Sequence, residues 1–114
     1  MAIKLLLHGK LRDGNADGYR DLAARATALA REEEGTLEYK WLLSDDGHIV
    51  NADGYTDESA MFAHVGDMTD RGLLEEYVGL VEIEGFYVFG SVSDETRKAL
   101  ADFNPIYYSL VETL

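Results

Sequence analysis

The sequence predicts an α+β fold in a single domain that spans residues 1–114. Apolar residues first recur at helical spacing and later alternate with polar ones, which indicates a helix followed by a strand. Asp45-Asp46-Gly47 then supplies the residue types of a hairpin turn. The only proline is Pro105, so no proline-rich linker divides the chain.

The first 35 residues predict a strand and an amphipathic helix. Residues 2–11 carry the mixed apolar pattern of a strand, and Asp13-Gly14-Asn15 can form a turn and cap a helix. The helix is predicted by apolar residues three and four apart, namely Tyr19, Leu22, Ala23, Ala26, Leu29 and Ala30. Gly35 stands where a C-terminal helix glycine is expected. The three glutamates at 32–34 carry the wrong charge for that helix end, so they must be solvated or used elsewhere.

The next two segments predict a β-hairpin. Residues 36–44 alternate in polarity, and residues 48–56 return as the second strand. One face of that second strand holds Ile49, Asn51, Asp53 and Tyr55. A two-residue turn would set Lys40 opposite Asp53 and Leu42 opposite Asn51, whereas a three-residue turn would set Trp41 opposite Asn51. The sequence leaves both registers open.

Further helices and strands follow. Asp57 predicts a helix cap, and the next helix carries Ala60, Met61, His64 and Val65 at helical spacing. We expect Gly66-Asp67 to interrupt this helix and a second short helix to run from Thr69 to about Tyr77.

The C-terminal third completes the pattern. Residues 78–92 are rich in β-forming residues, with bends or bulges expected at Gly79, Gly85 and Gly90. Ser93 predicts the cap of a helix that ends at Ala101, and residues 105–114 predict a last strand. The order is that of the ferredoxin-like split βαβ sheet, with an appended C-terminal helix and strand.

Such a sheet is covered by helices on one face and is bare on the other. We expect the bare face to carry Trp, Tyr and aliphatic side chains together with Asn and Asp. An exposed patch of this kind marks a ligand groove or a partner surface, and two sheets packed face to face would cover it. The sequence therefore predicts a homodimer.

Charge and composition exclude several partners. The net charge is −12, and residues 41–114 hold all of it, with three basic and fifteen acidic residues. This charge repels phosphate backbones and anionic membrane surfaces, so neither nucleic acid nor a membrane is an expected partner. The chain has no cysteine and no apolar run of the ~20 residues that a membrane span needs. We expect a cytoplasmic protein.

No motif indicates a metal or a cofactor. Phosphate-binding glycine loops, nucleophile elbows and zinc-helix motifs are missing from the sequence. Residues 49–54 imitate part of a calcium loop, but Ile49 and Ala60 would stand at the first and twelfth ligand positions. The three histidines fall in three separate elements. We therefore expect no metal, heme, flavin or nicotinamide.

A few residues are candidates for a site. Asn51 and Asp53 are poor strand formers in mid-strand, where an exposed edge is the alternative explanation. Trp41 is most simply a core residue, and His64 on its apolar helix face is most simply a structural imidazole.

The chain also resembles a known family. EEEGTLEYKWLLSDDGHIVNADGYTDESAMFAHV resembles the E-x-G-x-L-x-Y … D-D-G … E-x-Y-x-D-x-x-A-x-x-x-H segment of the antibiotic biosynthesis monooxygenase superfamily. IEGFYVFGSVSDETRKAL is similar to the late strand and terminal helix of many members. The resemblance implies a homodimer whose two sheets form a dimeric α/β barrel, with one ligand cavity per subunit between sheet and helices.

The resemblance also implies residues and activities. Tyr39 matches the aromatic position of the second strand, Tyr55 matches the aromatic that ends the third strand, and His64 matches the helix histidine. Asp53 stands where the family usually has Glu. Members include cofactor-free oxygenases of electron-rich aromatic substrates, quinol oxidases and heme-degrading proteins. The asparagine and histidine of the heme-degrading branch have no counterpart here, so heme degradation is not expected.

The resemblance thus implies a cofactor-independent monooxygenase or quinol oxidase that acts on a small aromatic molecule. His64 would be the catalytic base, with Asp53 as the alternative. Asn51 would donate to the developing oxyanion, and Tyr55 would bind a substrate hydroxyl. Tyr39 would bind the ring, as would Trp41 if the hairpin has the three-residue turn. Lys40 or Arg71 would have to offset the acidic surroundings. The alternative is a non-catalytic or stress-type dimeric barrel that binds a small hydrophobic ligand.

Overall fold

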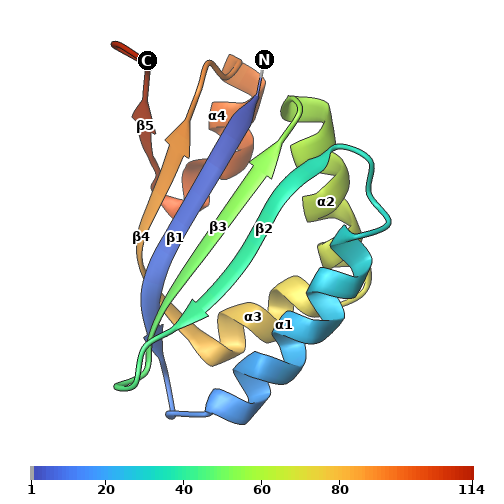
Figure 1. Ribbon diagram of the computed structural model, residues 1–114, viewed down its shortest axis with the longest axis vertical. Helices are drawn as coiled ribbons and strands as arrows, with labels where there is room; N and C mark the ends of the chain where they lie inside the picture. Colours follow the sequence, from blue (N-terminus) through green and yellow to red (C-terminus); the bar gives the residue numbers. More distant parts are fainter. Residues whose placement is uncertain (1) are drawn as a thin grey trace.

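A computed structural model describes residues 2–114 and confirms the α+β, ferredoxin-like fold (Figure 1). Its strands are β1 (Ile3–Leu11), β2 (Thr36–Leu43), β3 (His48–Tyr55), β4 (Val81–Phe89) and β5 (Ile106–Tyr108). Its helices are α1 (Ala16–Ala30), α2 (Glu58–Asp70), α3 (Leu73–Leu80) and α4 (Asp94–Leu100), and a 3-10 turn η1 (Ala101–Phe103) follows α4. The strands form one sheet in the order β2-β3-β1-β4-β5, in which only β5 pairs in parallel.

The hairpin adopts the three-residue turn. Trp41 pairs with Asn51 and Tyr39 pairs with Asp53. The amide of Ser44 donates to the carbonyl of His48 at 2.8 Å, which closes a loop of residues 45–47. Gly47 has φ 85°, the left-handed conformation that such a loop requires at its last position. This register places Trp41 and Asn51 side by side on the same face of the sheet.

The side chains that were expected on the bare face of the sheet lie on its helix-covered face instead. Trp41, Asn51 and Asp53 lie on the face that the helices cover, because all three line a cavity with residues of α2 and α3. The bare face instead carries Leu42 and Val50, which are cross-strand partners, and Leu6 beside Tyr87. The predicted alternation of side chains along β3 is confirmed. Both faces of β3 carry apolar side chains, however, and the packing of the helices decides which face is covered.

The helix α1 ends earlier than expected. Its last residue is Ala30, and Gly35 does not have the left-handed conformation of a C-terminal helix glycine. Gly35 instead packs against Ala60 of α2, where an added Cβ atom would collide with the Ala60 side chain. The amide of Thr56 donates to the carbonyl of Gly35 at 2.9 Å, which fixes this segment against the end of β3.

The boundary between α2 and α3 also lies at a different residue from the one predicted. Residues 66 and 67 lie inside α2, which continues unbroken to Asp70, so the predicted interruption is wrong. The chain breaks at Gly72, which has φ 73° and directly precedes α3. Residues 78–80 belong to α3 rather than to the following strand. The predicted helix caps Asn15, Asp57 and Ser93 are confirmed, since each side chain accepts a hydrogen bond from the first helical turn.

The strand β4 contains the expected bulge at Gly85. His8 pairs with Gly85 but Gly9 pairs with Ile83, so Glu84 is the extra residue. The last strand is much shorter than residues 105–114, since only Ile106–Tyr108 pair with β4. Beyond it, Leu110, Val111 and Leu114 are exposed.

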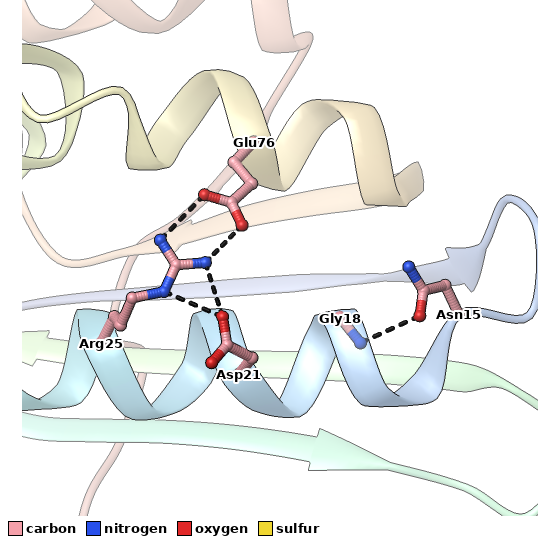
Figure 2. Close-up of polar contacts among 5 residues, drawn as sticks. All are labelled: Asn15, Gly18, Asp21, Arg25 and Glu76. Atoms are coloured by element: carbon pink, nitrogen blue, oxygen red, sulfur yellow. Dashed lines mark hydrogen bonds and ion pairs between the residues drawn. The ribbon is translucent and has the colours of Figure 1, made fainter.

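An ion-pair cluster joins α1 to α3 (Figure 2). The guanidinium of Arg25 donates to both carboxylate oxygens of Glu76 in α3 and to Asp21 one turn away in α1. These groups are largely exposed, so the cluster contributes little to the stability of the fold. No helix in the described part of the chain is both long and apolar enough to cross a bilayer.

The buried residues form two core clusters between sheet and helices. One cluster lies under α1 and α3 and is centred on Tyr19, Leu22 and Val81. The other lies under α2 and α4 and is centred on Ile3, Tyr55 and Met61. Leu7 of β1 packs against both clusters.

Candidate functional site

A cavity of about 110 Å³ lies between the sheet and the helices. Its walls are mainly aliphatic and aromatic, with three polar residues, Asn51, Asp53 and His64, among them. An enclosed engineered cavity of about 150 Å³ binds benzene, so this partly open cavity can hold a single small ring. The lining residues are Leu5, Leu7, Tyr39, Trp41, Asn51, Asp53, His64, Val65, Met68, Leu74, Tyr77, Ile83, Phe86, Leu100 and Phe103.

His64 is a buried histidine held by a carboxylate. Its side chain is 4% exposed, and its Nδ1 lies 2.7 Å from Oε1 of Glu33. The ring also contacts Tyr39 edge-on at 4.9 Å between centroids and Tyr55 at 5.8 Å. With an ionised Glu33, Nδ1 must carry the proton, which leaves the lone pair of Nε2 free to accept another.

Asp53 is a second titratable group at the cavity wall. Burial raises its pKa from 3.8 to about 6, although the hydrogen bond from Tyr55 and the nearby His64 offset part of this effect. The Tyr55 hydroxyl donates to Oδ2 of Asp53 at 3.0 Å. Asp53 consequently changes its protonation state close to neutral pH and can hold or release a proton there.

Asn51 and Trp41 are held by aromatic neighbours. The Tyr77 hydroxyl donates to Oδ1 of Asn51 at 2.6 Å, which leaves the amide nitrogen of Asn51 as the remaining donor. The Trp41 ring meets Tyr77 edge-on at 5.6 Å and Tyr19 at 5.2 Å. Burial raises the pKa of the Tyr39 and Tyr77 hydroxyls, so both remain neutral donors. The rings form a rigid wall around the cavity.

The structure brings five of the six predicted site residues to one cavity. His64, Asp53, Asn51, Tyr39 and Trp41 all line it. Tyr55 is fully buried behind Asp53 and does not line the cavity.

Two further residues contact the site, and the sequence did not identify them as candidates. Glu33 contacts His64 from a loop, and its only signal was a charge that does not suit a helix end. Tyr77 fixes Asn51, and nothing in the sequence marks it.

The expected cationic groups do not reach the cavity. Lys40 projects from the bare face and lies 3.6 Å from Glu38. Arg71 is the exposed C-cap of α2. No lysine or arginine among residues 2–114 lines the cavity. Across the same residues, no group of three or more His, Cys, Asp or Glu side chains is placed to hold a metal ion.

The sequence matches the model of the antibiotic biosynthesis monooxygenase family over residues 4–67. The fold is similar to MupZ from Pseudomonas fluorescens, which is 16% identical, with 99% of this chain and 88% of that chain covered and a TM-score of 0.86. It is also similar to SnoaB from Streptomyces nogalater, a cofactor-independent oxygenase, at 16% identity, 81% and 94% coverage and a TM-score of 0.67. Rv0793 from Mycobacterium tuberculosis is 18% identical, with 82% and 98% coverage and a TM-score of 0.68. At these identities the likeness concerns the fold alone, and no curated protein matches the chain.

Proposed function

The chain belongs to the antibiotic biosynthesis monooxygenase family, and we propose that it oxygenates a single-ring hydroquinone or similar electron-rich phenol without a bound cofactor. One observation carries the proposal: a carboxylate-held histidine lines an apolar cavity of about 110 Å³. The reaction type is inferred from the family, and the substrate size is inferred from the cavity volume.

The reaction needs a base and a dry pocket. His64 Nε2 takes the proton of a substrate hydroxyl, and the resulting phenolate is electron-rich enough to pass an electron to O₂. For a hydroquinone the overall change is hydroquinone plus O₂ to hydroxyquinone plus water. One oxygen atom enters the ring and the other leaves as water. The substrate supplies all four electrons, so no external reductant enters the balance.

The other residues have complementary roles in this proposal. The Asn51 amide nitrogen donates to the oxygen on which charge develops, and Tyr77 fixes its orientation. Asp53 is the alternative proton acceptor, and Tyr55 holds it in place. Tyr39 and Trp41 pack against the ring, and Met68 and Leu74 exclude water.

Oxygen uptake tests the proposal directly. Purified protein is given hydroquinone, a two-ring hydroquinone and a three-ring anthrone, and O₂ consumption is recorded for each. We expect turnover to be fastest with the single ring and His64→Ala to lower kcat about 10²-fold or more. The control is His48→Ala, which removes an exposed histidine from the hairpin. Full activity of the His64→Ala protein would exclude His64 as the base.

A binding protein is the second candidate function, and the largely apolar lining of the cavity favours it. Trp41 is the only tryptophan and lines the cavity, so its fluorescence reports occupancy by a quinone. Quenching that saturates without O₂ uptake across the whole panel would support ligand binding without catalysis.

We also propose that two chains pack sheet against sheet. The bare face presents Leu42, 51% exposed, and Tyr108, 45% exposed, which stacks on Phe89. The described residues expose 7086 Å² of surface, whereas a compact monomer of 12.7 kDa should expose about 6,200 Å². Part of this excess comes from the exposed tail after β5, where Leu110, Val111 and Leu114 lie.

A further inference from the structure

Glu33 lies in the loop between α1 and β2, yet its carboxylate is nearly buried. Its side chain is 13% exposed. Oε1 accepts a hydrogen bond from the Thr36 hydroxyl at 3.1 Å in addition to its 2.7 Å contact with His64 Nδ1. The loop is fixed nearby, because Gly35 packs on Ala60 of α2 and accepts a hydrogen bond from Thr56 at the end of β3.

The second carboxylate oxygen has no partner. Glu33 Oε2 is buried and lacks a hydrogen bond within the described part of the chain. A buried carboxylate with an unpaired oxygen costs free energy, and an amide at this position would bring no buried charge. A purely structural role therefore does not require the charge. A charge opposite Nδ1 becomes useful when His64 is protonated, because it then pairs with the imidazolium.

We infer that Glu33 is a positioning residue that holds His64 in the Nδ1–H tautomer and pairs with the imidazolium once Nε2 has taken a proton. This inference rests on the proposed function for its catalytic part. The substrate proton ends on Nε2, Nδ1 keeps its own proton, and none passes to Glu33. Besides Glu33 from the loop, the groups that face His64 are Asp53 and Tyr55 from β3 and Tyr39 from β2.

The test compares Glu33→Gln with Glu33→Asp and with Glu32→Gln, an exposed neighbour as control. An amide can rotate and donate to Nδ1, which would stabilise the wrong tautomer. We expect Glu33→Gln to lower kcat for hydroquinone about 100-fold with KM changed less than two-fold. Glu33→Asp should recover at least part of kcat, and Glu32→Gln should match the unmodified protein.

A spectroscopic measurement separates this inference from the proposed function. Imidazole ¹⁵N spectra of the substrate-free protein at pH 8 identify which ring nitrogen of His64 carries the proton. We expect Nδ1–H in the unmodified protein and in Glu33→Asp, and a change toward Nε2–H in Glu33→Gln. This result without any turnover would support the role of Glu33 while contradicting the oxygenase proposal. An unchanged tautomer in a folded Glu33→Gln protein would overturn the inference, whatever the turnover.

Discussion

At the scale of single residues, Asp53 links the candidate site to the stability of the fold. Burial raises its folded-state pKa from 3.8 to about 6. Between these two values the folded chain binds more protons than the unfolded chain, so the free energy of unfolding falls as pH rises. This difference of about two pKa units corresponds to about 3 kcal/mol in the free energy of unfolding. The folded protein has lost this contribution once the pH is well above 6.

Asp53→Asn should therefore stabilise the protein at neutral pH. The amide keeps an acceptor for Tyr55 but never becomes charged. We expect the variant to gain up to about 3 kcal/mol relative to the unmodified protein between pH 3.5 and pH 7.5. Urea unfolding at both pH values measures the gain, with the exposed Asp13→Asn as control. A gain that is equal at the two pH values would contradict the assigned cause.

The residues of the site were predictable from the sequence to different degrees. Asn51 and Asp53 stand out because polar residues in mid-strand need partners, and alternation places them on one face. The sequence could not tell which face the helices cover, since Val50 and Ala52 make the other face apolar as well. Glu33 could not be predicted either, because its partner His64 is 31 residues away and only packing brings them together.

At the scale of elements, two glycines that look alike in the sequence act differently. Gly66 lies inside α2 and Gly72 separates α2 from α3. An added Cβ atom would meet no other atom within 4 Å at either position. The difference is therefore one of backbone conformation, since Gly72 has φ 73° and Gly66 is helical.

Alanine substitutions should separate the two positions. Gly66→Ala should raise the free energy of unfolding by about 0.5–1 kcal/mol, because alanine has the higher helix propensity. Gly72→Ala should lower it by about 1–2 kcal/mol, because an L-residue is strained at that positive φ. Urea denaturation of the two variants measures both changes, and equal signs would show that the helix boundary lies elsewhere.

The elements themselves were largely predictable, but their boundaries were less so. Hydrophobic periodicity identifies α1, β2 and β3 because each has one buried face. The hairpin register stayed open because Asp46-Gly47 suits both turn lengths. The break before α3 was misplaced because a glycine in a sequence does not reveal its φ, which depends on how the neighbouring helices pack.

At the scale of the whole molecule, the bare sheet face determines the expected assembly. Its side chains come from β1 to β5, and at its centre Leu6 lies between Ala52 and Tyr87. Covering about 800 Å² per partner contributes tens of kcal/mol before entropy costs at ~25 cal/mol/Å². Charges already on this face, those of Lys4, Glu38 and Lys40, pair with one another. An unpaired charge in place of an apolar side chain should therefore prevent the proposed dimer.

Leu42→Glu places such a charge on the bare face, and Val78→Glu places one on an exposed apolar position of α3. We expect the unmodified protein and Val78→Glu to sediment as dimers at micromolar concentration. Leu42→Glu should shift toward the 12.7 kDa monomer. Sedimentation of the unmodified protein as a monomer alone would exclude the proposed assembly.

The central position of β1 has a consequence for how the protein is made. β1 leaves the ribosome before both of its partner strands, since Leu6 pairs with Ala52 on one side and Tyr87 on the other. At 5–20 residues per second, about 4–16 s of translation separate Leu6 from Tyr87. During this time one edge of an apolar strand is unpaired and open to other nascent chains. A messenger truncated after codon 80 should therefore yield an insoluble product, because it encodes the central strand without β4.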